Sequence, residues 1–205
     1  MRPNIQEQIE QRIESFDDSY IFSSKDFLDI SDNVTIGVAL SRIAKRKKKK
    51  KIINGLYYKP VYIELIKEYS IPSIDDIAKA LARKFNWTIS PSGDYSLNIL
   101  HLSTQVPNTY EYVSSGPNRE YIIRGKTLIF KNVRQGVING FHPDSILLVQ
   151  AIQSLGKNRL EQDEIKILKG LFTKQEKKII LDETKYAPNW IYEIIKEICE
   201  DGKYD

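Results

Sequence analysis

Apolar residues recur at helical spacing in the first sixty positions, separated by short polar segments that are typical of helix starts. A first helix is predicted from apolar residues spaced three or four apart, namely Ile5, Ile9, Ile13 and Phe16. A second, short helix is predicted to begin after Ser23, because Ser23 and Asp26 form a capping-box pattern. We expect this helix to end near Ile30.

A third helix is predicted to run from the capping residues at 31–33 to about Lys47. Its core-facing residues follow the spacing i, i+3, i+4 and i+7, namely Ile36, Ala39, Leu40 and Ile43. The opposite side carries small, polar or basic side chains: Val34, Thr35, Val38, Ser41, Arg42 and Lys45. The helix therefore presents a face that the protein core does not use. Asn33 has two interpretations, a helix cap or a contact to a partner.

Residues 48–53 and 56–59 flank Asn54-Gly55, a strong signal for a two-residue hairpin turn. Three helices followed by a hairpin is the order of a winged helix-turn-helix, in which the third helix enters the major groove of DNA. We therefore predict a winged helix-turn-helix domain at about residues 1–65. The alternative is a small helical domain that ends in a hairpin and carries a solvated lysine run.

Two further segments are predicted downstream. A capped helix over about 73–85, with Ile77, Leu81 and Phe85 on one stripe, precedes several short strands separated by turns. This pattern predicts an α+β module at about 70–135. Helical patterns then follow at 144–155, 161–171, 173–183 and 188–201, which predicts a helical C-terminal region at 143–205. The predicted fold class of the chain is α+β.

Charge is unevenly distributed along the chain. The 205 residues include 31 Lys+Arg and 27 Asp+Glu, a net charge of +4. Residues 1–60 hold 12 of these basic and 8 of these acidic residues, so the whole excess lies there. Residues 41–59 contain nine basic side chains and no acidic one. This asymmetry favours a polyanion-binding surface at one end of an otherwise neutral protein.

Several function classes have no support in the sequence. No apolar run approaches the ~20 residues that a membrane-spanning helix needs, and the polar N-terminus does not have the pattern of a secretory signal. The single cysteine, Cys199, excludes a disulfide framework and a cysteine-based zinc site. His101 and His142 lie far apart, and nucleotide-binding and hydrolase motifs are absent. We predict a cytoplasmic protein that is not an enzyme, uses no cofactor and holds no metal.

Double-stranded DNA is the polyanion that best suits the third helix and the hairpin. The basic run at 45–51 would neutralise phosphates without reading sequence. Arg42 offers a planar fork for guanine, hydroxyls offer hydrogen bonds, and valines offer contacts to thymine methyl groups. The predicted DNA-binding residues are Val34, Thr35, Val38, Ser41, Arg42, Lys45, Arg46, Lys48, Lys49, Lys50 and Asn54. The alternative for the lysine run is a solvated face.

Four segments resemble AbiEi-like antitoxin proteins of bacteria: YIFSSKDFLDI at 20–30, ALSRIAK at 39–45, NGLYYKP at 54–60 and PSGDYSLNILHLSTQVP at 91–107. The resemblance covers about residues 5–135. It implies an N-terminal winged helix-turn-helix followed by a second domain, transcriptional autoregulation, and a type IV toxin–antitoxin system whose toxin resembles a nucleotidyltransferase. The chain departs from that pattern in the lysine run and over its final seventy residues.

These observations predict a sequence-specific, double-stranded DNA-binding transcriptional regulator. The resemblance implies that it is an antitoxin that represses its own operon. One alternative is a protein-binding antitoxin that neutralises a nucleotidyltransferase-like toxin, with DNA binding secondary. A second alternative is an RNA-binding accessory protein. Duplex DNA is the expected partner, a cognate toxin and a homodimer are further candidates, and no membrane is expected.

Overall fold

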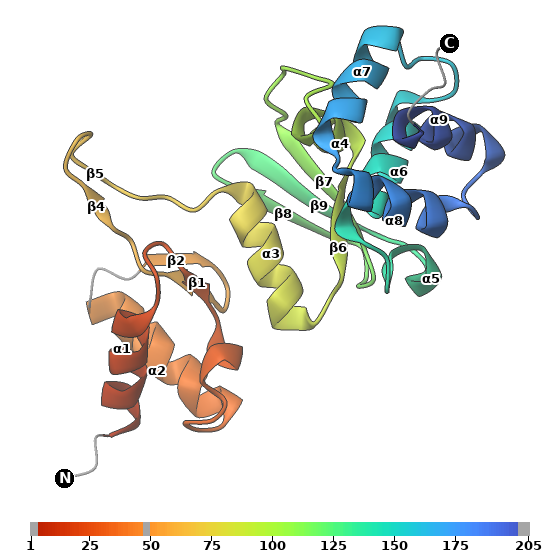
Figure 1. Cartoon of the computed structure of the whole chain (residues 1–205). Helices are drawn as coiled ribbons and strands as arrows, with labels where there is room; N and C mark the ends of the chain where they lie inside the picture. Colours follow the sequence, from red (N-terminus) through yellow and green to blue (C-terminus); the bar gives the residue numbers. More distant parts are fainter. Residues whose placement is uncertain (1–3, 47–49, 201–205) are drawn as a thin grey trace. The chain divides into compact units, whose positions relative to one another are not determined.

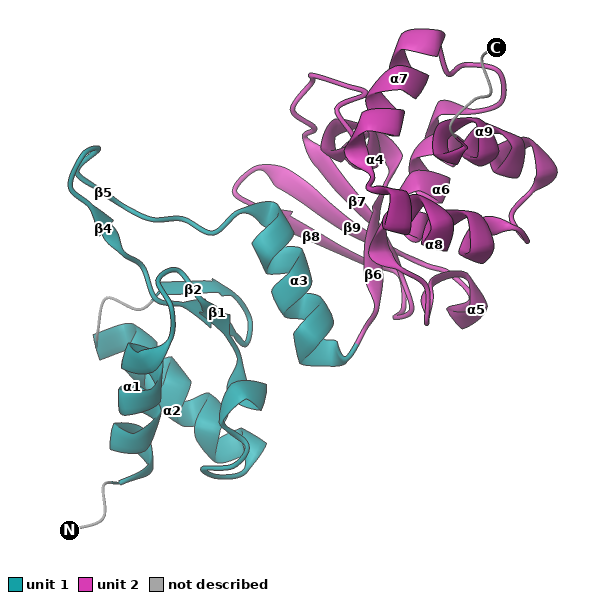
Figure 2. Ribbon diagram, in the orientation of Figure 1, with its two compact units in different colours: residues 1–86 teal, residues 87–205 magenta. Residues whose placement is uncertain are grey.

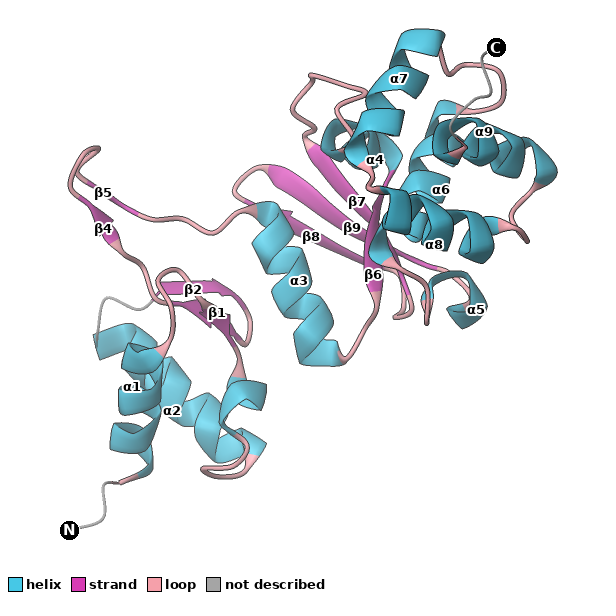
Figure 3. Ribbon diagram, viewed as in Figure 1, coloured by secondary structure: helices cyan, strands magenta, loops and turns pink. Residues whose placement is uncertain are grey.

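The computed structural model describes residues 4–46 and 50–200, and Figure 1 shows their helices and strands. The chain divides into two compact units, residues 1–86 and 87–205 (Figure 2). Both units combine helices with small sheets, as Figure 3 shows. The α+β class predicted from the sequence is therefore confirmed.

The N-terminal unit begins with helices and a three-stranded antiparallel sheet. Its first elements are α1 (Ile5–Ser15), β1 (Ile21–Phe22), the 3-10 helix η1 (Ser24–Phe27), α2 (Asn33–Arg46), β2 (Lys50–Ile53) and β3 (Leu56–Tyr58). The sheet order is β1-β3-β2, so the second hairpin strand pairs with both neighbours. Between β2 and β3, Gly55 has a φ of +72°, which glycine adopts without steric cost. The predicted Asn-Gly hairpin is confirmed.

One apolar core holds this part of the unit together. It takes residues from α1, β1, η1, α2 and β3: Ile9, Ile13, Phe22, Phe27, Ile36, Ala39, Leu40, Ile43 and Tyr57. Asn4 caps α1 and Ser23 caps η1, each in a reciprocal capping box. The buried stripe of α2 is the predicted one, and the opposite side of α2 is left outside the core. On the predicted stripe of α1, Ile9 and Ile13 are buried and Phe16 is partly buried, whereas Ile5 is 37% exposed because it is the first residue of the helix.

The N-terminal unit continues with a second, separate hairpin and a long helix. Strands β4 (Tyr62–Ile63) and β5 (Glu68–Tyr69) pair antiparallel, and α3 (Ile74–Phe85) follows. The hairpin was not predicted, because strands of two residues are too short for a period-two pattern. A capping box at Ser73 begins α3 as predicted. Phe85 was predicted on the buried stripe of α3, but it is 44% exposed because it is the last residue of the helix.

The C-terminal unit is built on a four-stranded mixed sheet. Its strands are β6 (Ile89–Ser92), β7 (Thr109–Ser114), β8 (Arg119–Ile123) and β9 (Lys126–Asn132), in the order β6-β7-β9-β8. Strands β7 and β9 run parallel, whereas the other two pairs are antiparallel. Helix α4 (Gly93–Ile99) connects β6 to β7. The several short strands predicted for this segment are confirmed, but the parallel pairing of β7 with β9 was not predicted.

Helices make up the rest of this unit: α5 (Gln135–Ile138), α6 (Pro143–Leu155), α7 (Gln162–Leu171), α8 (Lys174–Thr184) and α9 (Asn189–Cys199). Their largest shared core contains Leu148, Ile152, Leu168, Ile180, Ile191, Ile195 and Ile198. Four of these helices were predicted, whereas α5 has too few residues for a periodic signal. Among the described residues, every helix is too short or too polar to span a bilayer.

The two units differ from the three segments predicted from the sequence. Helix α3 is grouped with the N-terminal unit, and the sheet is grouped with the C-terminal helices. The sheet and these helices share a core, because Val113 of β7 packs with Ile138 of α5 and Ile146 of α6. A shared core between distant segments cannot be read from local patterns. As functional segments, the ranges 1–65, 70–135 and 143–205 stay predictions.

Candidate nucleic-acid interface

Helix α2 has a buried side and an exposed side. Ile36, Leu40 and Ile43 are at most 1% exposed, whereas Val34 is 75% and Val38 is 47% exposed. All the predicted contact residues of the helix are exposed, namely Val34, Thr35, Val38, Ser41, Arg42, Lys45 and Arg46. The helix contains no acidic residue. The structure therefore brings these predicted residues together on an exposed, acid-free helix.

The first turn of α2 is capped by Asp32. Its Oδ1 accepts hydrogen bonds from the amides of Val34 at 2.9 Å and Thr35 at 3.0 Å, and its Oδ2 accepts one from the Thr35 hydroxyl at 2.6 Å. The Thr35 hydroxyl, followed by the Thr35 amide, lowers the pKa of Asp32. The capping interpretation of Asn33 is wrong, since its Oδ1 accepts instead from the hydroxyl of Ser24 at 2.5 Å. Thr35 offers a partner its lone pairs, because its proton is already donated.

The hairpin after α2 presents the exposed residues Lys50 and Asn54. The side-chain oxygen of Asn54 accepts from Lys51 Nζ at 2.6 Å, and its main-chain oxygen accepts from Lys84 Nζ at 3.3 Å. Burial lowers the pKa of Lys84. Lys50 Nζ lies 5.4 Å from the ring centre of Tyr69. The other two predicted hairpin residues, Lys48 and Lys49, lie outside the described residues.

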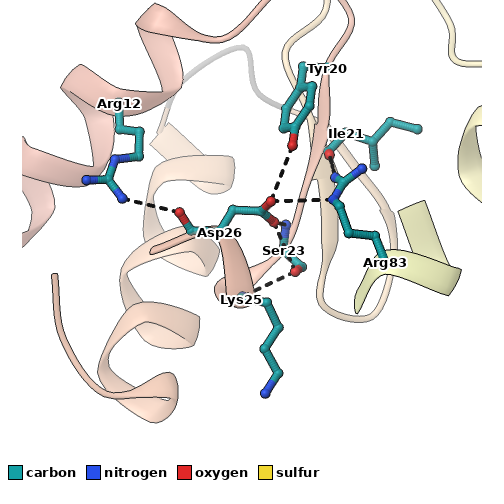
Figure 4. Close-up of polar contacts among 7 residues, drawn as sticks. All are labelled: Arg12, Tyr20, Ile21, Ser23, Lys25, Asp26 and Arg83. Atoms are coloured by element: carbon teal, nitrogen blue, oxygen red, sulfur yellow. Dashed lines mark hydrogen bonds and ion pairs between the residues drawn. The ribbon is translucent and has the colours of Figure 1, made fainter. Parts of the chain in front are cut away.

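A polar network around Asp26 supports the segment that precedes α2 (Figure 4). Asp26 Oδ2 accepts from the Ser23 amide at 2.8 Å, and Asp26 Oδ1 lies 3.6 Å from Arg83 Nε. Arg83 also donates to the main-chain oxygen of Ile21 at 2.5 Å and lies over the ring of Tyr20, 5.0 Å from its centre. Burial, followed by the charge of Asp26, raises the pKa of Tyr20. This network fastens η1 to α3, and sequence reasoning missed it because Arg83 is distant along the chain.

Arg12 of α1 holds the turn between η1 and α2. Its two terminal nitrogens donate to the two carboxylate oxygens of Asp29, at 2.5 and 2.7 Å, and one nitrogen also donates to the main-chain oxygen of Asp26 at 3.3 Å. The paired geometry adds direction to the attraction. The hydrogen bond from Arg12 lowers the pKa of Asp29. The entry to α2 is therefore held from α1 and from α3.

Gly37 lies inside α2, at the edge of its exposed side, three residues after Val34 and four before Ser41. Beyond its two chain neighbours and the backbone of its own helix, a Cβ placed on Gly37 would have no atom within 4 Å. Glycine in a helix interior costs about 0.5–1 kcal/mol relative to alanine. The intramolecular packing gives no reason for that cost. Sequence reasoning missed this residue, although a glycine inside a regular helical pattern was the available signal.

Chemically, the exposed side of α2 combines four kinds of group. Val34 and Val38 offer apolar surface, Ser41 offers a hydroxyl, Arg42 offers a guanidinium fork, and Lys45 offers a point charge. These groups suit a ligand with negative charge, hydrogen-bonding edges and methyl groups. An α-helix also matches the width of the major groove of duplex DNA.

No curated protein is similar enough to the chain to count as a relative. The chain matches one protein family, which is described without a function. The resemblance to AbiEi-like antitoxins therefore stays a prediction. The match extends over residues 8–180, which include most of α1, the exposed side of α2, the hairpin and most of the C-terminal unit. The chain therefore belongs to the family of unknown function DUF6088.

Proposed function

We propose that this protein is a sequence-specific, double-stranded DNA-binding transcriptional regulator whose N-terminal residues form a winged helix-turn-helix. The observation that carries the proposal is the exposed, acid-free side of α2. On it, apolar, hydroxyl and cationic side chains lie together: Val34, Val38, Ser41, Arg42 and Lys45. This combination provides both phosphate attraction and groups that distinguish base edges.

The connectivity of the N-terminal unit supports the same proposal. A strand, β1, lies between the first two helical segments and pairs with the second strand of the hairpin that follows α2. This pairing attaches the β2–β3 hairpin to the body of the unit through β3, and the hairpin follows α2 directly in the chain. In a winged helix-turn-helix, α2 would lie in the major groove while the hairpin contacts the flanking backbone.

The residues divide into two chemical roles. Lys45, Arg46 and Lys50, with the sequence-predicted Lys48 and Lys49, are assigned to phosphates, where each contact releases counterions. Arg42, Ser41, Thr35, Val34 and Val38 are assigned to base edges, and Asn54 at the turn of the hairpin is assigned to the minor groove or a phosphate. Arg12 and the Asp26 network are assigned to positioning, because they hold the turn that leads into α2.

Selection from a pool of random duplexes, with the full chain as bait, tests the proposal. We expect enrichment of one sequence that binds more tightly than random duplex in fluorescence anisotropy. Lys45→Ala should weaken binding to both duplexes, because it removes a phosphate contact. Lys178→Ala, an exposed lysine on α8, is the matched control and should leave binding unchanged. A pool without enrichment, and equal affinity for every duplex, would contradict the proposal.

We also infer, from the sequence resemblance, that the regulator is an AbiEi-like antitoxin that represses its own operon in the cytoplasm. A cognate toxin is then a further partner. The alternative, a protein-binding antitoxin with DNA binding secondary, differs in one measurement. If the alternative holds, the full chain should form a complex with the toxin encoded beside it and should show no preference among DNA duplexes.

A further inference from the structure

The turn of the β2–β3 hairpin is held by two lysine side chains. Lys51 Nζ donates to the side-chain oxygen of Asn54 at 2.6 Å, and Lys84 Nζ donates to the main-chain oxygen of Asn54 at 3.3 Å. Lys51 belongs to the hairpin itself, whereas Lys84 belongs to α3 and lies 30 residues after Asn54. Lys84 therefore ties the turn to an element outside the hairpin.

Gly55 leaves the space that the ammonium group of Lys84 occupies. A Cβ built on Gly55 would lie 2.7 Å from Lys84 Nζ, closer than a Cβ approaches its neighbours in folded proteins. A larger residue at this position would therefore displace the ammonium group from the turn. The positive φ of Gly55 is one reason why the turn needs glycine, and the contact with Lys84 is a second.

Helix α3 is itself fixed at the residue before Lys84. Arg83 donates to the main-chain oxygen of Ile21 in β1 at 2.5 Å (Figure 4), and β1 pairs with β3 of the hairpin. Arg83 Nε also lies 3.6 Å from Asp26 Oδ1. The last turn of α3 is therefore joined to the sheet that contains the hairpin, and Lys84 holds the hairpin turn from a fixed base.

The contact between Lys84 and the turn is not favourable for the fold alone. Burial lowers the pKa of Lys84, so the charged form is disfavoured where it lies, and among the described residues no carboxylate opposes this effect. An uncharged residue at position 84 would avoid that cost. The contact therefore orders the turn more than it stabilises the unit.

We propose that Lys84 is a positioning residue for DNA binding, which fixes the hairpin turn so that Asn54 reaches the duplex. This proposal rests on the function proposed above, in which Asn54 contacts the minor groove or a phosphate. A turn that is already fixed loses less conformational freedom on binding. The hydrogen bond from Lys84 therefore increases affinity without touching the DNA, whereas Lys50 is assigned to a phosphate directly.

Fluorescence anisotropy on the selected duplex compares two lysines of α3. Lys84→Met removes the donor but keeps an unbranched side chain, and it should weaken binding about three- to tenfold, the effect of one hydrogen bond. Lys79→Met is the matched control, because Lys79 has the same charge but pairs with Asp75 at 2.6 Å. It should leave affinity nearly unchanged. Equal losses in the two variants would overturn the proposal, because the lost charge alone would explain them.

Two further variants separate positioning from direct contact. Lys84→Arg keeps a cationic donor and should retain most of the affinity. In a chain that already carries Asn54→Ala, Lys84→Met should cost little more, because Lys84 acts through Asn54. Losses that add in full would show that Lys84 contacts the DNA by itself, and would overturn the proposal.

Backbone NMR order parameters of the free chain test the contact without DNA. We expect lower order parameters at residues 53–56 in Lys84→Met and unchanged ones in Lys79→Met, with similar melting temperatures for the two variants. Unchanged order in Lys84→Met would overturn the proposal. A wild-type chain that binds every duplex equally would contradict the proposed function and this proposal with it, whereas full affinity in Lys84→Met would overturn this proposal alone.

Discussion

Replacing Gly37 with alanine tests how closely a partner approaches α2. In the free protein the new Cβ meets no atom within 4 Å, so the substitution introduces no clash. Gly37 is interior to a helix of 14 residues, and helix propensity therefore predicts a gain of about 0.5–1 kcal/mol in the free energy of unfolding. In the complex with DNA that we propose, the methyl group would press into the groove beside Val34 and Ser41. Overpacking by one such group costs about 1–3 kcal/mol, or about five- to 150-fold in affinity.

The assay pairs urea unfolding with fluorescence anisotropy on the selected duplex. Gly170→Ala on α7 is the control, because a Cβ there also meets no atom within 4 Å. It should leave DNA affinity unchanged and stabilise less, since Gly170 lies next to the end of its helix. A Gly37→Ala variant that is more stable and binds as tightly as the wild type would refute the close approach. A less stable variant would refute the reasoning from helix propensity.

Four further outcomes follow from the same observations. Arg42→Ala should cost ~1–3 kcal/mol of binding free energy on the selected duplex and little on random duplex, and Arg42→Lys should not restore the preference. Equal losses on both duplexes would show that Arg42 does not recognise bases. Replacing Lys48, Lys49 and Lys50 together with alanine should make the log–log salt dependence of binding shallower, and an unchanged slope would show that they contact no phosphate. The pKa of Asp32 is lowered in the folded protein, so the stabilisation by its carboxylate is present at neutral pH and is lost as the pH falls through that pKa. The melting temperature of Asp32→Ala should therefore lie below that of the wild type at pH 7, and the two should converge in acid. Burial raises the pKa of Cys199 to about 11, so a thiol reagent at pH 8 should label it only on unfolding, and rapid labelling of folded protein would contradict its burial.

Local chemistry explains why most helices could be predicted. A capping box joins residues three positions apart, so Ser73 with Asp76 and Thr173 with Glu176 define helix starts without any tertiary information. The Asn54-Gly55 hairpin is equally local, because the turn depends on one glycine with a positive φ. The exposed side of α2 followed from the spacing of Ile36 and its buried neighbours.

Local signals were insufficient where neighbouring residues compete for one role or an element is short. Asp32 and Asn33 are both good caps, and only the geometry of the turn decides that Asp32 accepts from the first amides of α2. Phe85 satisfies the helical stripe of α3 but lies at its last residue, where the helix ends before the side chain is covered. The β4–β5 hairpin has too few residues per strand to produce a pattern.

The sequence by itself determined where most helices and strands form and which side of α2 is exposed, because those properties depend on residues within one or two turns. The tertiary structure decided that β1 pairs with β3, that β7 runs parallel to β9, and that Arg83 reaches Asp26. It also decided that the space around Gly37 is open. These features depend on contacts between residues far apart in the chain. Such contacts form only when all the elements pack together, so no local pattern contains them.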